Sequence, residues 1–141
     1  MAELTYAQVQ ACVMKNNHSG LSPEVVICIA WKESSFNPGE KNPHSSALGL
    51  MQVTKGAVDD VNRNTPAGVH FQHSEMIDPD KNIACATYYL ALRIKRAGGN
   101  VKKGIEGYGT GQGYADNILS CEACLKSLPT NTQECLDSIH P

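Results

Sequence analysis

The sequence predicts a single, mostly helical domain, and three observations support this fold class. The chain has 141 residues, which suits about one domain and can bury roughly two thirds of its unfolded surface. Hydrophobic residues make up 41% and charged residues 18%, a composition typical of globular proteins. Helix start and stop signals recur, with apolar residues at helical spacing between them. No internal repeat or linker divides the chain, so one domain is expected over residues 1–141.

The first two helices are predicted over residues 6–17 and 23–35. Thr5, followed three residues later by Gln8, is a capping-box pattern, and the face expected to be buried repeats at helical spacing. Ser22, followed by proline and glutamate, is a strong N-cap signal for the second helix. The predicted buried face of the first helix consists of Tyr6, Val9, Cys12 and Val13.

The segment after the second helix is predicted to be a short β-hairpin or turn region. Residues 37–48 are rich in Asn, Pro, Ser and Gly, and residues 49–53 form a short apolar stretch. A brief helix is expected over 55–63. Residues 62–78 show no clear period and are expected to form an irregular loop.

The C-terminal half is predicted to hold two longer helices. One starts at Asp78-Pro79-Asp80, ends at Gly98-Gly99 and buries a stripe of apolar residues. Five glycines in 100–113 indicate tight turns or close backbone approach. The next helix covers 114–128 and ends at Pro129, and a short helix is expected around Cys135. The stripe consists of Ile83, Ala84, Thr87, Leu90 (or Ala91) and Ile94.

Charge and hydropathy exclude several classes of function. Twelve Lys and Arg against fourteen Asp and Glu give a net charge of −2, so no basic footprint for nucleic acid is present. The longest apolar run, Val25 to Trp31, is far shorter than a membrane span. His70 and His73 form an H-x-x-H pattern without a third ligand, so no metal and no cofactor are expected.

The six cysteines predict up to three disulfides and an oxidising compartment. Buried free thiols with a redox or metal pair at Cys121-x-x-Cys124 are the alternative. The N-terminus has no charged region followed by an apolar one. Two explanations stay open: a mature form with an added Met, or export by another machine. The disulfide candidates are Cys12, Cys28, Cys85, Cys121, Cys124 and Cys135.

Glu33 is the strongest candidate for catalysis. It follows Val26, Ile29 and Ala30 at helical spacing, which places its carboxyl on the buried face of the second helix. Desolvation raises the pKa of such a carboxyl, which is what a general acid for glycosidic cleavage needs near neutral pH. The alternative is a solvated glutamate at a helix end.

Two motifs resemble those of the lytic transglycosylase family, close to the goose-type branch of the lysozyme superfamily. Glu33-Ser34-Ser35-Phe36-Asn37-Pro38 is similar to the family's E-S-x-x-x-P segment, which makes Glu33 the catalytic acid by resemblance. Ser46-Ala47-Leu48-Gly49-Leu50-Met51-Gln52 is similar to the segment that lines the glycan cleft. The resemblance implies that Ser46, Gly49, Met51 and Gln52 bind substrate, with Gln52 as the hydrogen-bonding member.

The resemblance continues more weakly along residues 21–120. Asp78 to Leu90 matches a segment whose role is structural, through Asp78, Pro79, Asn82, Ile83, Tyr89 and Leu90. Gly107-Tyr108-Gly109-Thr110-Gly111 looks like a variant of A-Y-N-A-G, whose Tyr hydroxyl touches the catalytic carboxyl, so Tyr108 takes that role. Gly109 replaces the family Asn, which puts substrate preference in doubt. Tyr114 resembles a final Tyr at the cleft, and the cysteine-rich tail 121–141 lies outside the resemblance.

This family likeness implies a lysozyme-like α+β fold and cleavage of the β-1,4 bond between N-acetylmuramic acid and N-acetylglucosamine in peptidoglycan. The turn before Gly49 holds no acid, and Glu40, Asp59 and Asp60 are the nearest carboxylates in sequence. A missing second carboxylate favours the transglycosylase route, in which Glu33 alone acts as acid and then as base.

The biological setting is expected to be secretion followed by action in the bacterial periplasm. The chain resembles the cell-wall-degrading toxins of type VI secretion systems, which travel with an immunity protein. A housekeeping or conjugation-type transglycosylase, and a module that binds peptidoglycan without cleaving it, are the alternatives.

Overall fold

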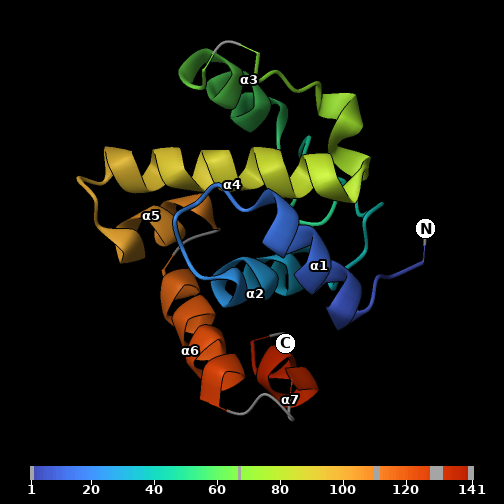
Figure 1. The fold of residues 1–141 in the computed structure, drawn as a ribbon, viewed down its shortest axis with the longest axis vertical. Coiled ribbons are helices and arrows are strands. Elements are labelled where there is room, and N and C mark those ends of the chain that lie inside the picture. The colour runs from blue at the N-terminus through green and yellow to red at the C-terminus, as the bar shows by residue number, and fades with distance from the viewer. Residues whose placement is uncertain (1, 67, 110–111, 128–131, 140–141) are drawn as a thin grey trace.

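The structure is a computed structural model that describes residues 2–66, 68–109, 112–127 and 132–139. Within them the fold is mostly helical, as the sequence predicts (Figure 1). The turn region after the second helix holds two isolated antiparallel bridges, Lys41 to Leu48 and Leu48 to Val53. The helices are α1 (Tyr6–Asn16), α2 (Pro23–Ser34), α3 (Lys55–Asn64), the 3₁₀ helix η1 (His73–Ile77), α4 (Pro79–Arg96), α5 (Val101–Tyr108), α6 (Tyr114–Ser127) and α7 (Thr132–Asp137).

The long helix α4 runs across the molecule and organises the packing (Figure 1). Helices α1, α3 and α5 all pack against it, and α3 lies on the opposite side of it from α1 and α2. Helix α2 packs against α1 and α6. Val26, Ile29 and Ala30 of α2 are fully buried in the core, so the predicted buried face is confirmed up to the turn that carries Glu33.

The predicted helix starts are confirmed by their caps. Thr5 forms the capping box with Gln8. The Ser22 hydroxyl accepts a hydrogen bond from the Val25 amide, and the Asp78 carboxylate accepts one from the Lys81 amide. These side chains bind amides that the first helical turn leaves without a partner, which is why a single residue marks each start.

The main difference from the predicted elements is α5, because the glycine-rich segment forms a helix over Val101–Tyr108 rather than turns. The glycines serve close approach instead: a Cβ on Gly104 would lie 2.4 Å from Cγ1 of Ile94 on α4. A second difference is η1, which forms inside the segment expected to be irregular. Thr110, Gly111 and Pro129 lie outside the described residues.

Two disulfides form among the six cysteines. Cys28 bonds Cys121 and joins α2 to α6, and Cys124 bonds Cys135 and joins α6 to α7. The two cysteines of the C-x-x-C pattern therefore have different partners. Cys12 and Cys85 are both buried and unpaired, so two of the up to three disulfides that the sequence predicts are formed.

The structure also shows where the H-x-x-H pattern lies and whether any helix could cross a membrane. Nε2 of His73 lies 3.1 Å from the carbonyl oxygen of Val53. Among the described residues, no three His, Cys, Asp or Glu side chains gather in a group that could hold a metal ion. Within the same residues, no helix combines the length and apolar character needed to cross a membrane.

Candidate active site

Glu33 lies in the last turn of α2 and lines a pocket of about 100 Å³. The helix ends immediately after it, with Ser35 and Phe36 at positive φ of 52° and 66°. Left-handed backbone is uncommon for residues other than glycine, so the chain turns sharply there. The carboxyl is therefore carried by a helix whose preceding turns are fixed in the core.

The environment of Glu33 favours its protonated form. Burial raises the pKa of the Glu33 carboxyl, and this outweighs a hydrogen bond from Tyr114 and the positive charge of Lys32, which both lower it. The Tyr114 hydroxyl donates that hydrogen bond to Oε2 of Glu33 at 2.7 Å. A raised pKa favours the protonated carboxyl, which can release its proton to a basic atom in the pocket.

The two tyrosines exchange the roles that the sequence predicts. The Tyr108 hydroxyl donates to the carbonyl oxygen of Met51 at 2.6 Å, so the predicted contact between this hydroxyl and Glu33 is wrong. Tyr114, at the start of α6, makes the contact instead. Tyr108 still lines the pocket, and its ring lies 5.9 Å from that of Tyr89, between ring centres.

Gly109 explains how Tyr114 reaches Glu33. A Cβ on Gly109 would lie 2.2 Å from Cγ of the Tyr114 ring, far inside van der Waals contact. Any side chain at this position would displace the ring. The departure from the family's Asn therefore makes room for Tyr114 beside the Glu33 carboxyl.

The segment from Leu48 to Val53 forms one wall of the site and is held by Asn82 of α4. Asn82 is fully buried; its amide oxygen accepts from the Met51 amide and its amide nitrogen donates to the carbonyls of Leu48 and Met76. Gly49, at φ 81°, would place a Cβ 2.0 Å from the Met76 carbonyl oxygen, so glycine is required there. Asn82 matches the family motif and has the structural role expected of it.

The predicted substrate-binding residues of this segment divide into two groups. Gln52 lines the pocket, and its amide nitrogen donates to the carbonyls of Glu40 and Gly49, which leaves the amide oxygen to bind a ligand. Met51 is fully buried and Gly49 is packed against η1 and α4, and neither is among the residues that line the pocket, so their contact with substrate stays a prediction. The Ser46 hydroxyl accepts from the Lys55 amide and is not among the lining residues.

Four lining residues were not predicted as site residues: Val53, Thr54, Ala57 and Tyr89. Tyr89 belongs to a matched motif but was expected to be structural. Thr54 caps α3, since its hydroxyl accepts from the Ala57 amide. The cap signal was available in the sequence, whereas its position beside Glu33 follows only from the fold.

Glu33 is the only carboxyl among the residues that line this pocket. Of the nearest acids in sequence, Asp60 binds the Arg96 guanidinium at 2.5 and 2.7 Å, which lowers the pKa of Asp60. Asp59 is exposed, and the Glu40 carboxylate accepts from Asn37 at 3.2 Å. None of Glu40, Asp59 and Asp60 is among the lining residues of this pocket.

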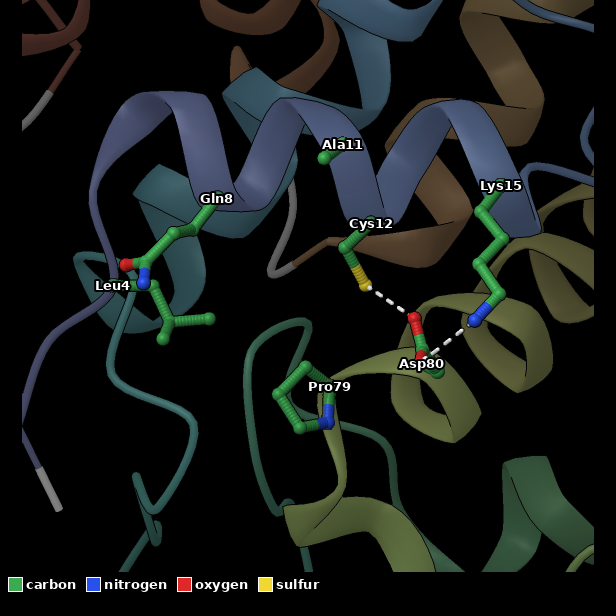
Figure 2. A pocket seen from close by; sticks show the side chains of 7 residues that line it. All are labelled: Leu4, Gln8, Ala11, Cys12, Lys15, Pro79 and Asp80. Atoms are coloured by element: carbon green, nitrogen blue, oxygen red, sulfur yellow. Dashed lines mark hydrogen bonds and ion pairs between the residues drawn. The ribbon is translucent and has the colours of Figure 1, made fainter.

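A larger hollow of about 350 Å³ lies between α1 and the start of α4 (Figure 2). Figure 2 shows the Cys12 thiol pointing at Asp80, to which it donates at 3.3 Å, with Lys15 on the other carboxylate oxygen. Burial and this carboxylate raise the pKa of Cys12 to about 12, so the thiol stays protonated and is a poor nucleophile. None of the predicted catalytic residues lines this hollow.

The chain resembles known proteins in sequence. Residues 10–122 match the family model of the transglycosylase SLT domain. Over 74 residues, or 52% of the chain, it is 39% identical to membrane-bound lytic murein transglycosylase C of Cronobacter sakazakii and 38% identical to that of Klebsiella pneumoniae. The match covers 20% of either relative, so the chain spans about a fifth of their length.

The fold also matches solved structures. The 70-kDa soluble lytic transglycosylase of Escherichia coli superposes with a TM-score of 0.63 at 23% identity, over 96% of this chain and 23% of that one. Its complex with bulgecin A gives the same TM-score at 22% identity, with the same coverage. The lysozyme-like fold class expected from the motifs is thereby confirmed.

Proposed function

The chain belongs to the transglycosylase SLT family, and on that premise we propose that it cleaves the β-1,4 bond between N-acetylmuramic acid and N-acetylglucosamine in peptidoglycan. The observation that carries the proposal is the Glu33 carboxyl, which lines a pocket, has a raised pKa and accepts a hydrogen bond from Tyr114. A protonated carboxyl at a sugar-binding surface is the group that glycosidic cleavage requires.

We propose that the reaction is a transglycosylation in which Glu33 serves both steps. Glu33 protonates the glycosidic oxygen, and the bond from this oxygen to C1 of the muramyl residue breaks. The C6 hydroxyl of the same sugar then bonds to C1 and gives its proton to the Glu33 carboxylate, which closes a 1,6-anhydro ring. The absence of a second carboxyl among the pocket-lining residues supports this route, since an inverting hydrolase needs one to activate water.

The other lining residues are proposed to hold the glycan. The amide oxygen of Gln52 is available to accept from a sugar hydroxyl or acetamide N–H, because the amide nitrogen is bound to the backbone. The rings of Tyr89 and Tyr108, which lie at 58° to each other, offer an apolar surface for a sugar face. Val53 and Ala57 add apolar area to the same wall.

Purified sacculi test the proposal against a module that only binds peptidoglycan. The wild-type chain is expected to clear a sacculus suspension, as measured by turbidity. Glu33→Gln is expected to sediment with the sacculi without clearing them. Binding by both proteins with clearance by neither would support the binding module instead.

Tyr114→Phe is expected to slow cleavage and to move its pH profile. The Tyr114 hydrogen bond lowers the pKa of Glu33, so its loss raises that pKa, and the limb that reports deprotonation of Glu33 moves to higher pH. A hydrogen bond to a charged group contributes about 1.5–3 kcal/mol, which is roughly tenfold to a hundredfold in rate. The measurement is the initial rate of sacculus clearance across pH.

Tyr108→Phe is the matched control for this prediction. Its hydroxyl binds a carbonyl of the pocket wall, so its loss is expected to reduce stability by about 1 kcal/mol and leave the shape of the pH profile unchanged. A profile that moves in Tyr108→Phe and stays fixed in Tyr114→Phe would return the carboxyl contact to Tyr108.

For the biological role, we propose a secreted antibacterial effector that acts in the periplasm and has a cognate immunity protein. Two disulfides support an oxidising compartment. The housekeeping reading is compatible with the same site. Directed to the periplasm of a Gram-negative host, an effector is expected to lyse the cells, and the product of the adjacent gene to protect them by covering the pocket. Growth without lysis would favour the housekeeping role.

A further inference from the structure

Tyr114 must start α6 at a defined place to reach Glu33, and the carboxylate of Glu106 on α5 binds that start. Oε1 of Glu106 accepts from the Gly113 amide at 2.9 Å, and Oε2 accepts from the Ala115 amide at 2.7 Å. These amides flank Tyr114 on both sides and belong to the end of a helix where N–H groups lack intrahelical partners. A carboxylate is also favoured there by the helix dipole.

The connection continues from α6 to the catalytic carboxyl. The Tyr114 ring is nearly buried and lies against the backbone of Gly109, where no Cβ can fit. Its hydroxyl reaches Oε2 of Glu33 at 2.7 Å. The ring is thus held by packing on one side and by the helix start on the other, and Glu106 fixes the latter.

We propose that Glu106 is a positioning residue that sets the hydrogen bond between Tyr114 and Glu33. This inference rests on the proposed function in one respect: the hydrogen bond between Tyr114 and Glu33 matters for cleavage only if Glu33 is the catalytic acid. Glu106 itself does not line the pocket with Glu33, so it acts through Tyr114.

The sign of the effect on Glu33 distinguishes positioning from direct charge. If Glu106 acted through its charge, removing this negative charge would lower the pKa of Glu33. If it acts through Tyr114, removing it loosens a hydrogen bond that lowers the pKa of Glu33, and that pKa rises. The two mechanisms therefore predict opposite shifts.

The charged and titratable neighbours of both carboxyls are known. Asp116 raises the pKa of Lys102 most, because the two form an ion pair at 2.9 Å on the exposed side, and the negative charge of Glu106 raises this pKa less. Around Glu33 the groups are Tyr114 from α6 and Lys32 from α2. Burial raises the pKa of Tyr108 from α5 most, the charge of Glu33 raises it further, and Cys85 and Tyr89 of α4 act on it in the same way. Tyr114 is the group through which a change at the start of α6 reaches Glu33.

The test is an NMR titration of the ¹³C-labelled Glu33 carboxyl, with cleavage kinetics on the same proteins. Glu106→Ala removes both acceptor oxygens and is expected to raise the Glu33 midpoint toward that of Tyr114→Phe. The expected loss of rate is about tenfold, the low end for a hydrogen bond to a charged group. Glu106→Gln keeps one acceptor, so an intermediate shift is expected, and this variant carries the test if Glu106→Ala does not fold.

Two further proteins complete the test. In the Tyr114→Phe background, Glu106→Ala is expected to cause no additional shift, because the bond it positions is already absent. Thr5→Ala removes the N-cap of α1, which is expected to lower the free energy of unfolding by an amount comparable to that for Glu106→Ala and to leave the Glu33 titration unchanged. A Glu33 midpoint that is unchanged or lowered in both Glu106 variants, or a shift that persists in Tyr114→Phe, would overturn the proposal. The titration does not require the protein to cleave peptidoglycan. If the wild-type chain fails to cleave it, the proposed function is overturned, while the titration still tests the role of Glu106.

Discussion

Glu33→Gln is expected to abolish sacculus clearance while the fold stays intact. The substitution is nearly isosteric, and the Tyr114 hydroxyl can still donate to the amide oxygen of glutamine. It removes the only carboxyl among the pocket-lining residues, which is the group proposed to give a proton to the glycosidic oxygen. Loss of a general acid costs about 10²–10⁴ in rate. The check is turbidity, with circular dichroism to confirm the fold.

Glu40→Gln is the matched control for that loss. Glu40 is a nearby, partly buried loop carboxylate that binds Asn37, and glutamine keeps an acceptor for this bond. Its clearance rate is expected to match wild type. Residual clearance by Glu33→Gln above roughly a tenth of wild type, well short of the expected loss, would remove Glu33 from the catalytic role.

Glu33→Gln is also expected to change the stability of the folded chain, and the sign of this change depends on pH. The pKa of Glu33 is raised in the folded chain, mainly by burial, so the folded state binds this proton more tightly than the unfolded state does. The stability that this proton contributes is present below the unfolded pKa and is lost as the pH rises through the folded pKa. The melting temperature of Glu33→Gln relative to wild type should therefore increase as the pH is raised from below 4.5, the ordinary value, to neutral. A difference that is constant with pH would contradict the buried, destabilised carboxylate.

The second large effect is expected from the disulfide between Cys28 and Cys121, which joins the helix of Glu33 to the helix of Tyr114. Its cysteines are 93 residues apart, whereas Cys124 and Cys135 are 11 apart. In the chain-entropy model the long loop contributes about 4–5 kcal/mol and the short one about 3 kcal/mol. The double alanine variants should differ in this order in urea unfolding.

Thiol titration checks the pairing that this order depends on. The untreated, denatured wild-type protein should show two thiols, from Cys12 and Cys85. Six thiols would remove the disulfides and the argument for an oxidising compartment. Equal midpoints for the two double variants would contradict the special importance of the link between α2 and α6.

Much of the fold could be predicted because its signals are local. A capping side chain and a periodic apolar face specify α1, α2 and α4 within a few residues of Thr5, Ser22 and Asp78. Helix α5 could not be predicted in the same way. Its glycines indicate turns locally, and only the approach of Ile94 on α4 explains Gly104 inside a helix.

The site could be predicted in part for the same reason. Glu33 follows from helical spacing and from a motif, and its environment agrees with both. The exchange between Tyr108 and Tyr114 depends on the room that Gly109 leaves and on the place where α6 starts. Glu106 was missed because its carboxylate caps a different helix, across residues 107–112, and no local pattern marks such a bond.

Mass spectrometry of the soluble products from purified sacculi tests the central claim most directly. The claim is that one carboxyl, Glu33, cleaves the glycan strand as acid and then as base. It predicts muropeptides that end in 1,6-anhydro-N-acetylmuramic acid for the wild-type chain and none for Glu33→Gln. Products with reducing ends, heavier by one water, would contradict it, because water rather than the C6 hydroxyl of the same sugar would then have attacked C1.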